Sequence, residues 1–442
     1  MGEDGLSDAG PSSGTVGTGP VGPGQRALGS RPAGRGPLGR RFAQLWTCFA
    51  LASAGDGFAY GAVPLLAVAV DPHPLAVSAV IAADRLPWLL VALPAGSFAD
   101  RFERSRVMAA ANGLRAVLFV LLAVLLLTHS IDLALLILGV LANASGRAIY
   151  YSAVQAAVPQ LVPAEALARA NGRISGTEAA AEHLGGPIVG SFTFALSRAV
   201  PFLMDAAAMA SSILPLPGLR GETRVPESKS SASVLAGVRR IFADRRLRLL
   251  VGLIAGLAGL QGLVSGILVL VATRDWGVHA GGYGLFVAAG AAGNLPGALL
   301  ADRIARRLGS VVALILSGGV AGLGYLLMAG SHSWLPAGAS FALTGFAVGA
   351  GVVIATTIRQ RLVPAELMGR VSAAWRGIVW GAIPAGSLVA GGLAVLGGLR
   401  LPLLVAGGAQ IALAIALALP LTRILGPKGT GAEPEPLSEG SP

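Results

Sequence analysis

The chain has few charged side chains, few aromatic residues and a single cysteine. Only 12% of its 442 residues are charged and 54% are hydrophobic, whereas a soluble protein carries about 25% charged residues. The one thiol, Cys48, has no second cysteine in the chain with which to form a disulfide, and we expect it to be a buried packing residue. The shortage of charge excludes an ordinary soluble domain.

The sequence also lacks the patterns that carry enzymatic chemistry. We find no nucleophile–base arrangement, no cluster of metal-ligand residues and no glycine-rich phosphate loop followed by Lys-Ser or Lys-Thr. The missing loop argues against ATP as an energy source. We therefore predict that the protein is not an enzyme and uses no cofactor and no metal.

Glycine and long apolar runs are abundant instead. The 63 glycines suit a helical membrane protein, in which small residues let helices approach closely. The apolar runs are near the ~20 residues that span a bilayer, and open strands are not tolerated in lipid. We predict an all-α membrane protein with transmembrane helices at 43–70, 75–98, 107–128, 131–157, 168–196, 200–218, 249–272, 282–301, 309–329, 334–357, 369–395 and 401–422.

Two phrases recur at nearly one offset and indicate an internal duplication. Asp100-Arg101 returns as Asp302-Arg303 (302 − 100 = 202), and the Leu-Val-Pro-Ala-Glu phrase around Pro163 returns around Pro364 (364 − 163 = 201). Such a repeat is typical of a transporter with two similar halves around a central site. The predicted parts are a disordered cytoplasmic tail at 1–41, six-helix halves at 42–218 and 249–423, a linker at 219–248 and a disordered cytoplasmic tail at 424–442.

The arginines predict the orientation of the chain. Alternate loops hold most of them, and the other loops hold only Arg198, Arg274 and Arg400. By the positive-inside rule, both termini and the linker lie in the cytoplasm. This placement accounts for much of the net charge of +11 without a nucleic-acid partner.

The linker contains a candidate amphipathic helix from Val234 to Arg248. Val234, Val238, Ile241 and Phe242 fall on one side, with arginines around them. We interpret it as a helix held at the membrane surface by headgroup charge, with a regulatory or partner-binding role as the alternative.

The loop after the second predicted helix carries a specific motif. Gly96-Ser-Phe-Ala-Asp100-Arg101-Phe-Glu-Arg104 resembles the loop between helices 2 and 3 of the major facilitator superfamily. The copy at Asp302-Arg303 departs from the pattern, because Ala298 stands at the glycine position. The resemblance implies a twelve-helix transporter over residues 42–423.

The motif suggests a conformational latch. The Asp100 carboxylate can face the positive end of a helix dipole in the other half, and Pro364 marks the start of a suitable helix. Asp302 would make the equivalent contact near Pro163. The alternative is a solvated charge cluster that only enforces topology.

Shorter matches narrow the resemblance. The phrase Leu161 to Glu165, the pair Ala170-Asn171, Asp205 within Phe-Leu-Met-Asp-Ala, and Gly55-Asp56-Gly57 are similar to the macrolide-efflux branch of proton-coupled drug exporters. Gly186-Pro187-Ile-Val-Gly190 resembles the antiporter motif Gly-Pro-x-x-Gly.

Charged groups at membrane depth are costly and are therefore candidates for function. The first half contains Asp56, Asp84, Arg85, Arg115, Arg147, Glu178, Glu182, His183 and Asp205, whereas the second half offers little beyond Arg376. We hypothesise that the first half handles protons and that the apolar second half supplies substrate surface.

Asp56 is the leading candidate. It lies about 20 Å along its helix at ~1.5 Å per residue, beside two glycines that allow close approach of neighbouring helices. We expect it to carry a proton or contact a cationic substrate. The alternative is a static ion pair with Arg85 or Arg147.

Glu178 and Glu182 are four residues apart, so they share a helix face and repel unless a proton or a basic group intervenes. Arg147 is the best intervening group, and a proton-linked role and a structural network are equal alternatives. His183 is expected to be packed and hydrogen-bonded. Asp205 is expected near the outer helix end, in solvent, with a role in proton coupling or substrate binding as the alternative.

We expect Arg115 and Arg376 to extend toward the cytoplasmic surface. Trp375 and Trp380 lie five apart and do not share a face, so at most one would line an apolar pocket. Ordinary packing is the alternative for both.

These observations predict a monomeric cell-membrane exporter of a hydrophobic or amphiphilic molecule in exchange for protons. The two halves would rock about a central site. The alternatives are a siderophore or lysolipid transporter of the same fold, or a membrane receptor or scaffold.

Overall fold

A computed structural model describes residues 38–90, 103–219, 221 and 234–425. Within those ranges the regular elements are all helical, and no strand occurs, which confirms the predicted fold class. The first half contains α1 (Arg40–Val70), α2 (Pro74–Leu90), α4 (Arg104–Leu127), α5 (Leu133–Leu161), η1 (Ala164–Ala166), α6 (Leu167–Glu178), η2 (Ala179–Gly185), α7 (Gly186–Leu196), α8 (Val200–Ile213) and η3 (Leu216–Leu219). The second contains α9 (Val234–Ala243), α10 (Arg245–Arg274), α11 (Ala280–Leu308), α12 (Ser310–Gly330), α13 (Trp334–Leu362), α14 (Ala365–Gly397) and α15 (Leu401–Leu425).

Among the described residues, ten helices are long and apolar enough to cross a membrane. The other two predicted spans correspond to α2, which the structure describes to Leu90, and to the run α6–η2–α7. Several helices extend past their predicted ends into arginines, as at Arg40, Arg104 and Arg245. Long basic side chains reach the headgroup region, so the backbone stays helical beyond the apolar run.

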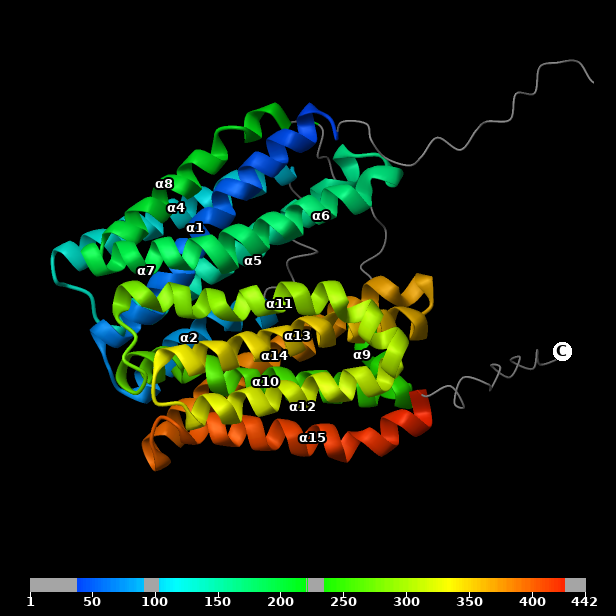
Figure 1. Cartoon of the computed structure of the whole chain (residues 1–442). Coiled ribbons are helices and arrows are strands. Elements are labelled where there is room, and N and C mark those ends of the chain that lie inside the picture. Colours follow the sequence, from blue (N-terminus) through cyan, green and yellow to red (C-terminus); the bar gives the residue numbers. More distant parts are fainter. Residues whose placement is uncertain (1–37, 91–102, 220, 222–233, 426–442) are drawn as a thin grey trace, which may run out of the picture. The chain divides into compact units, whose positions relative to one another are not determined.

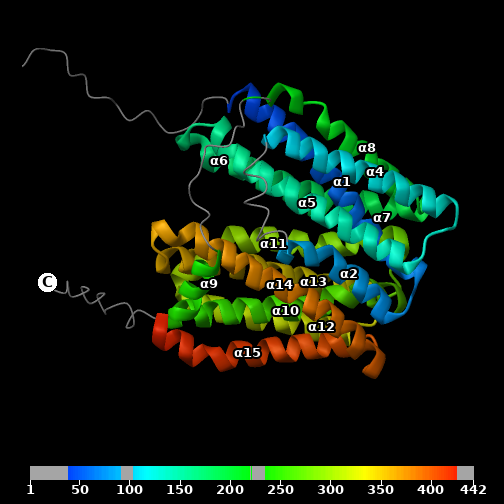
Figure 2. The ribbon, with the colours of Figure 1, turned by 180° about the vertical axis from the view of Figure 1, so that it is seen from behind.

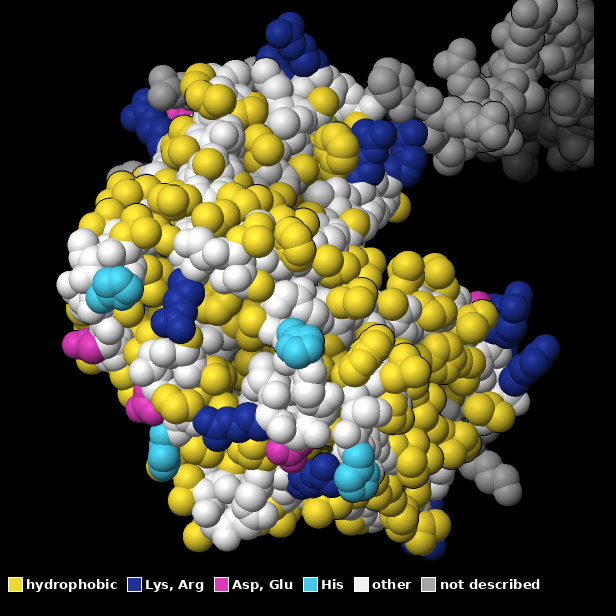
Figure 3. Space-filling model, turned by 60° about the vertical axis from the view of Figure 1, so that its left-hand side comes forward, with side chains coloured by type: hydrophobic (Ala, Val, Ile, Leu, Met, Phe, Trp, Pro, Cys, Tyr) yellow, Lys and Arg dark blue, Asp and Glu magenta, His cyan; other side chains and the backbone are white. Residues whose placement is uncertain are grey.

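Exposed apolar side chains identify the lipid-facing surface. On α4, Leu114, Val117, Leu121 and Val124 are all exposed and follow the three- and four-residue spacing of one helix face. Hydrophobic side chains likewise cover much of the face in Figure 3, with charged groups standing singly or in small clusters among them. Since α4 is long and apolar enough to cross a membrane, an exposed apolar stripe of this kind fits a face in contact with lipid.

The predicted helix at 168–196 is helical along its whole length but is not an α-helix throughout. It consists of α6, the π-helical segment η2 and α7. Pro187 stands in the first turn of α7 and has no N–H with which to continue an α-helical ladder from the preceding turn. A π segment is a common way for a helix to absorb such an interruption.

Glycines bring α1 and α7 into backbone contact. A β-carbon on Gly57 would lie 2.8 Å from Gly186 Cα, and one on Gly61 would lie 2.9 Å from Pro187 Cα. Gly190 lies equally close against the backbone of Phe58. Since a β-carbon would not fit at these positions, the Gly-Pro-x-x-Gly segment is the surface on which α1 rests.

Helices of the two halves also contact one another. Figures 1 and 2 show α2 beside α14, and α11 packs against α7. Gly284 of α11 lies against Pro187, and its N–H donates to Ser191 Oγ at 2.9 Å. Gly391 of α14 lies against Ser78 of α2. These contacts occur near the helix ends that lie away from the arginine-rich loops.

The predicted amphipathic helix at 234–248 ends earlier than expected. α9 stops at Ala243 because Asp244 caps α10, with its Oδ1 accepting from Arg246 N at 2.8 Å. α9 packs on α14, where Gly237 lies against the backbone of Arg370 and Ile241 is buried. Phe242 is exposed, and the placement of this helix at the membrane surface stays a prediction.

Candidate functional site

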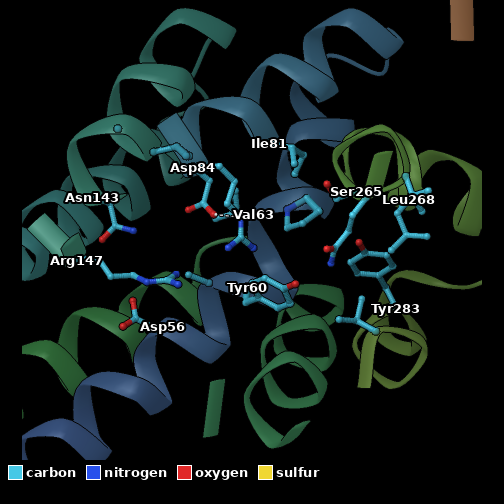
Figure 4. Close-up of a pocket in the computed structure, with 18 of the residues that line it drawn as sticks. Asp56, Tyr60, Val63, Ile81, Asp84, Asn143, Arg147, Ser265, Leu268 and Tyr283 are labelled. Carbon is cyan, nitrogen blue, oxygen red and sulfur yellow. Dashed lines mark ion pairs between the residues drawn. The ribbon is translucent and has the colours of Figure 1, made fainter. Parts of the chain in front are cut away.

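A cavity lies among helices of both halves and encloses about 1200 Å³, part of it open to solvent. Asp56, Asn143 and Arg147 gather on one wall, and Ser265, Leu268 and Tyr283 lie on the other (Figure 4). The first-half wall holds the charged groups. The second-half wall is formed by Gln261, Val264, Ser265, Leu268, Tyr283, Val287, Tyr325 and Phe341.

Asp56 forms a buried ion pair with Arg115 of α4. Arg115 is fully buried, and its other nitrogens donate to Asn143 Oδ1 at 2.9 Å and Asn112 Oδ1 at 3.3 Å. The prediction that Arg115 extends to the surface is therefore wrong, and so is the choice of Arg85 or Arg147 as the ion-pair partner. The pair depends on which helices meet, and α4 supplies the nearest guanidinium.

Arg147 of α5 lines the cavity and pairs with Glu182, a second buried carboxylate. Its guanidinium lies 2.6 Å from Glu182 Oε1 and 5.7 Å from the centre of the Trp88 ring. Glu178 accepts a hydrogen bond from Tyr151 at 3.3 Å. The two glutamates thus have different partners, because Glu178 ends α6 whereas Glu182 lies within η2, where the π-helical turn changes the spacing between them.

Asp84 and Arg85 are neighbours in α2 and lie 3.4 Å apart at their closest charged atoms. The Arg85 guanidinium stands 5.7 Å from the centre of the Tyr60 ring, a distance suited to a cation–π contact. His183 packs edge-on against the same ring, with ring centres 5.6 Å apart. Tyr60 of α1 therefore contacts both Arg85 of α2 and His183 of η2.

Asp205 of α8 is fully buried. The prediction that it lies in solvent near the outer helix end is wrong, because α1 and α4 both pack against α8 and cover it. Gly55 lies directly against its carboxylate. Neither oxygen has a hydrogen-bond partner among the described residues.

The two tryptophans of α14 have different surroundings. Trp375 is buried, and the Arg359 guanidinium lies over its ring, 5.0 Å from the ring centre. Trp380 lines a second, largely apolar cavity within the second half, and its ring centre lies 4.9 Å from that of Trp88. That cavity shares Gln261 and Tyr325 with the first.

The motif residues Gly96, Asp100 and Arg101 lie outside the described residues, so the latch at Asp100 stays a hypothesis. Arg104 is buried and donates to the carbonyl of Ala156.

Asp302 is exposed and pairs with Arg306 of its own helix. Arg303, its neighbour in the second copy of the motif, is also exposed. The proposed contact of Asp302 with the helix start near Pro163 is replaced here by this local pair.

Several cavity residues were not anticipated, among them Tyr60, Asn143, Gln261 and Tyr283. Asn143 had a usable signal, since it lies one helical turn before Arg147 on the same face. No group of three potential metal ligands occurs in the described part of the chain.

Comparison with known proteins places this geometry in context. The family model described as Major Facilitator Superfamily matches residues 45–383. The enterobactin exporter EntS of Escherichia coli O1:K1 / APEC is 29% identical over 286 residues, which cover 63% of this chain and 67% of that protein. EntS of Shigella dysenteriae serotype 1 is 29% identical over 290 residues, with the same coverage.

Solved structures of similar fold include a bacterial homologue of the iron transporter ferroportin in an inward-facing state. It has a TM-score of 0.69 and 17% identity, and the match covers 86% of this chain and 98% of that one. The nucleoside transporter NupG has a TM-score of 0.68 and 13% identity, with 87% and 100% covered. At such low identity these likenesses concern the fold alone.

Proposed function

The chain belongs to the Major Facilitator Superfamily, a family of membrane transporters and not of enzymes, and we propose that it exports an amphiphilic small molecule in exchange for protons. The observation that carries this proposal is the buried Asp56–Arg115 pair beside the central cavity. A charged pair is expensive to bury in a membrane protein, and a purely structural role would be served by apolar packing.

The unequal walls of the cavity support an amphiphilic substrate. Charged and amide groups of α1, α2 and α5 face an aromatic and aliphatic wall that includes Tyr283, Tyr325 and Phe341. A ligand with one polar end and one apolar body would satisfy both walls at once. The second apolar cavity, which continues from Gln261 and Tyr325, enlarges the surface available to the apolar part.

Two substrate classes follow from independent observations. The short motifs at Asp56, Asn171 and Asp205 resemble the macrolide-efflux branch. The relatives that are 29% identical are enterobactin exporters, which favours a siderophore as the second candidate. Both classes are amphiphilic, so both suit a cavity with one polar and one apolar wall.

Alternating access is the mechanism we propose. The contacts of Gly284 with Pro187 and of Gly391 with Ser78 lie at the helix ends away from the arginine-rich loops. With those loops in the cytoplasm, this conformation is closed toward the outside. Protonation would then favour one of the two states only if the proton binds more tightly to that state than to the other.

The test is proton movement in proteoliposomes that contain the purified full chain and a trapped pH-sensitive dye. A pH gradient is imposed, and erythromycin, enterobactin or a lysophospholipid is added. Wild type should show proton movement that depends on one of these compounds, and Asp56→Asn should not.

The matched control is Asp132→Asn, because Asp132 is an exposed cap at the start of α5 and asparagine caps helices equally well. It should behave as wild type. Equal proton movement in Asp56→Asn would transfer the coupling role to Glu178 and Glu182. Wild type that moves no protons with any of the compounds would contradict the proton-exchange proposal.

A further inference from the structure

The buried charges of the first half do not balance. Among its described residues at membrane depth, this half holds five carboxylates (Asp56, Asp84, Glu178, Glu182 and Asp205) and three guanidinium groups (Arg85, Arg115 and Arg147). Each guanidinium is paired with one carboxylate, at Asp84, Asp56 and Glu182 respectively. Glu178 has the Tyr151 hydroxyl as a donor. Asp205 remains without a donor among the described residues.

The surroundings of Asp205 are unsuited to a negative charge. It is fully buried, next to Phe202, whose ring is stacked on that of Phe119 at 6.3 Å. It lies several residues inside α8, which begins at Val200, so the free N–H groups of the helix start are out of reach. An ionised carboxylate without a partner in such a site would cost several kcal/mol. A protonated carboxyl group removes most of that cost.

Arg115 is the cation that could serve Asp205 in another state. Asp205 interacts electrostatically most strongly with Arg115, then with Asp56 and Arg147. Neither α7 nor η3, which also pack against α8, carries a titratable side chain.

The network of Arg115 already reaches α8. Asn112, which accepts from Arg115, donates to Ser212 Oγ at 2.8 Å. Ser212 lies seven residues after Asp205 and therefore on the same face of the helix. Asp205 and Asp56 thus approach one guanidinium from two neighbouring helices.

We propose that Asp205 binds a proton in this conformation, and that Arg115 is shared, pairing with Asp56 while Asp205 is protonated and with Asp205 once that proton leaves. Release transfers the proton from the Asp205 carboxyl to water and leaves a carboxylate that attracts Arg115 away from Asp56. This inference rests on the proposed proton exchange and assigns it a second, buried acceptor. Gly55, which lies against Asp205, gives the carboxyl the room to approach α1.

Infrared spectroscopy of the purified full chain tests the protonation state without any substrate. At neutral pH the wild type should show the C=O stretch of a protonated carboxylic acid, although a free aspartate ionises at about pH 3.9. Asp205→Asn should lose that band, and Asp132→Asn should keep it. If Asp205→Asn instead loses a carboxylate band and keeps the carboxylic acid band, Asp205 is ionised in the wild type and the proposal is overturned.

The sharing of Arg115 is tested by Asp56→Asn. Removing the competing anion should let Asp205 ionise against Arg115, so the same band should fall in a variant that keeps Asp205 itself. An unchanged band in Asp56→Asn would overturn the sharing.

Folding is checked by the melting temperature. Asp205→Asn replaces a neutral carboxyl group with a neutral isostere, so its melting temperature should stay close to that of the wild type. A marked drop would indicate an ionised, structurally paired Asp205 and would contradict the proposal.

Proton movement in proteoliposomes connects this site to transport. Asp205→Asn should lose the substrate-dependent proton movement seen in wild type, and undiminished movement would overturn its role in coupling. Failure of wild type itself to move protons would contradict the proposed function, whereas the infrared result stands on its own.

Discussion

The contact between Gly284 of α11 and Pro187 of α7 brings the backbones of the two halves together. A β-carbon on Gly284 would meet the Pro187 carbonyl and would lie 2.5 Å from Ser191 Oγ. The carbonyl belongs to a helix that is itself fixed against α1, so it cannot turn aside. Gly284→Ala should therefore force α11 and α7 apart in this conformation.

The magnitude follows from overpacking. Inserting a methyl group into a close-packed site costs about 1–3 kcal/mol. The methyl group no longer clashes when the halves separate, so the substitution destabilises only the conformation in which α11 and α7 touch. A penalty of that size changes the ratio of the two states by about 5–150-fold.

Cysteine labelling at a second contact between the halves measures the change. Ser78 of α2 is fully buried against Gly391 of α14, and Ser78→Cys alters one atom. In a Cys48→Ala background, the rate of maleimide labelling at position 78 reports how often the halves separate. Gly284→Ala should raise that rate by about 5–150-fold.

Gly282→Ala is the matched control. It makes the same change in the same helix, where a β-carbon would meet only Val278 Cγ1 at 3.8 Å, an ordinary contact. Its labelling rate should equal that of the parent. Equal rates in Gly284→Ala and Gly282→Ala would refute the argument that this contact holds the closed state.

Three further outcomes follow from the first half. Arg115→Gln leaves Asp56 buried without its cation and should destabilise the protein by about 3–5 kcal/mol, seen as a lower melting temperature that adding Asp56→Asn largely restores; an additive double variant would contradict the pairing. Gly57→Ala should sharply reduce the yield of folded protein, because α7 backbone fills the space beside it, whereas Gly172→Ala, which meets nothing within 4 Å, should add about 0.5–1 kcal/mol to stability in a denaturation assay. Glu182→Gln should lower the melting temperature more than the same change at an exposed glutamate, since it leaves a buried arginine unpaired; equal effects would show that the ion pair contributes little.

The sequence was sufficient for the architecture because a membrane imposes a simple length requirement on apolar runs. The spans predicted at 309–329 and 401–422 agree to within a few residues with α12 and α15. The ends that extend into arginines were missed, because an arginine in sequence gives no indication of whether its backbone remains helical. The π segment at 179–185 had only the Gly-Pro pair after it as a signal.

The partners of the buried charges could not be predicted in the same way. Asp56 could be recognised as a candidate from its depth in a helix, yet its pairing with Arg115 depends on how α1 and α4 both pack against α8. Asp205 illustrates the same limit. Counting along α8 gave its distance from the helix end, but its burial is set by other helices that cover it. The functional roles of these residues stay predictions.

The unequal distribution of charge between the halves has a consequence for how the protein is made. α1, α4 and α5 each carry a charge in the body of the span, at Asp56, Arg115 and Arg147, and an isolated helix bearing such a group inserts at a cost of about 2.5–3.5 kcal/mol. Apart from Arg376 of α14, the charged residues described in the second half lie toward the helix ends, where the cost of insertion is small. Helices of the second half can thus enter the bilayer one at a time during synthesis. Those of the first half gain full stability only when neighbours arrive, so their assembly in the membrane is cooperative, and a chain truncated after α1 would be held poorly in the lipid.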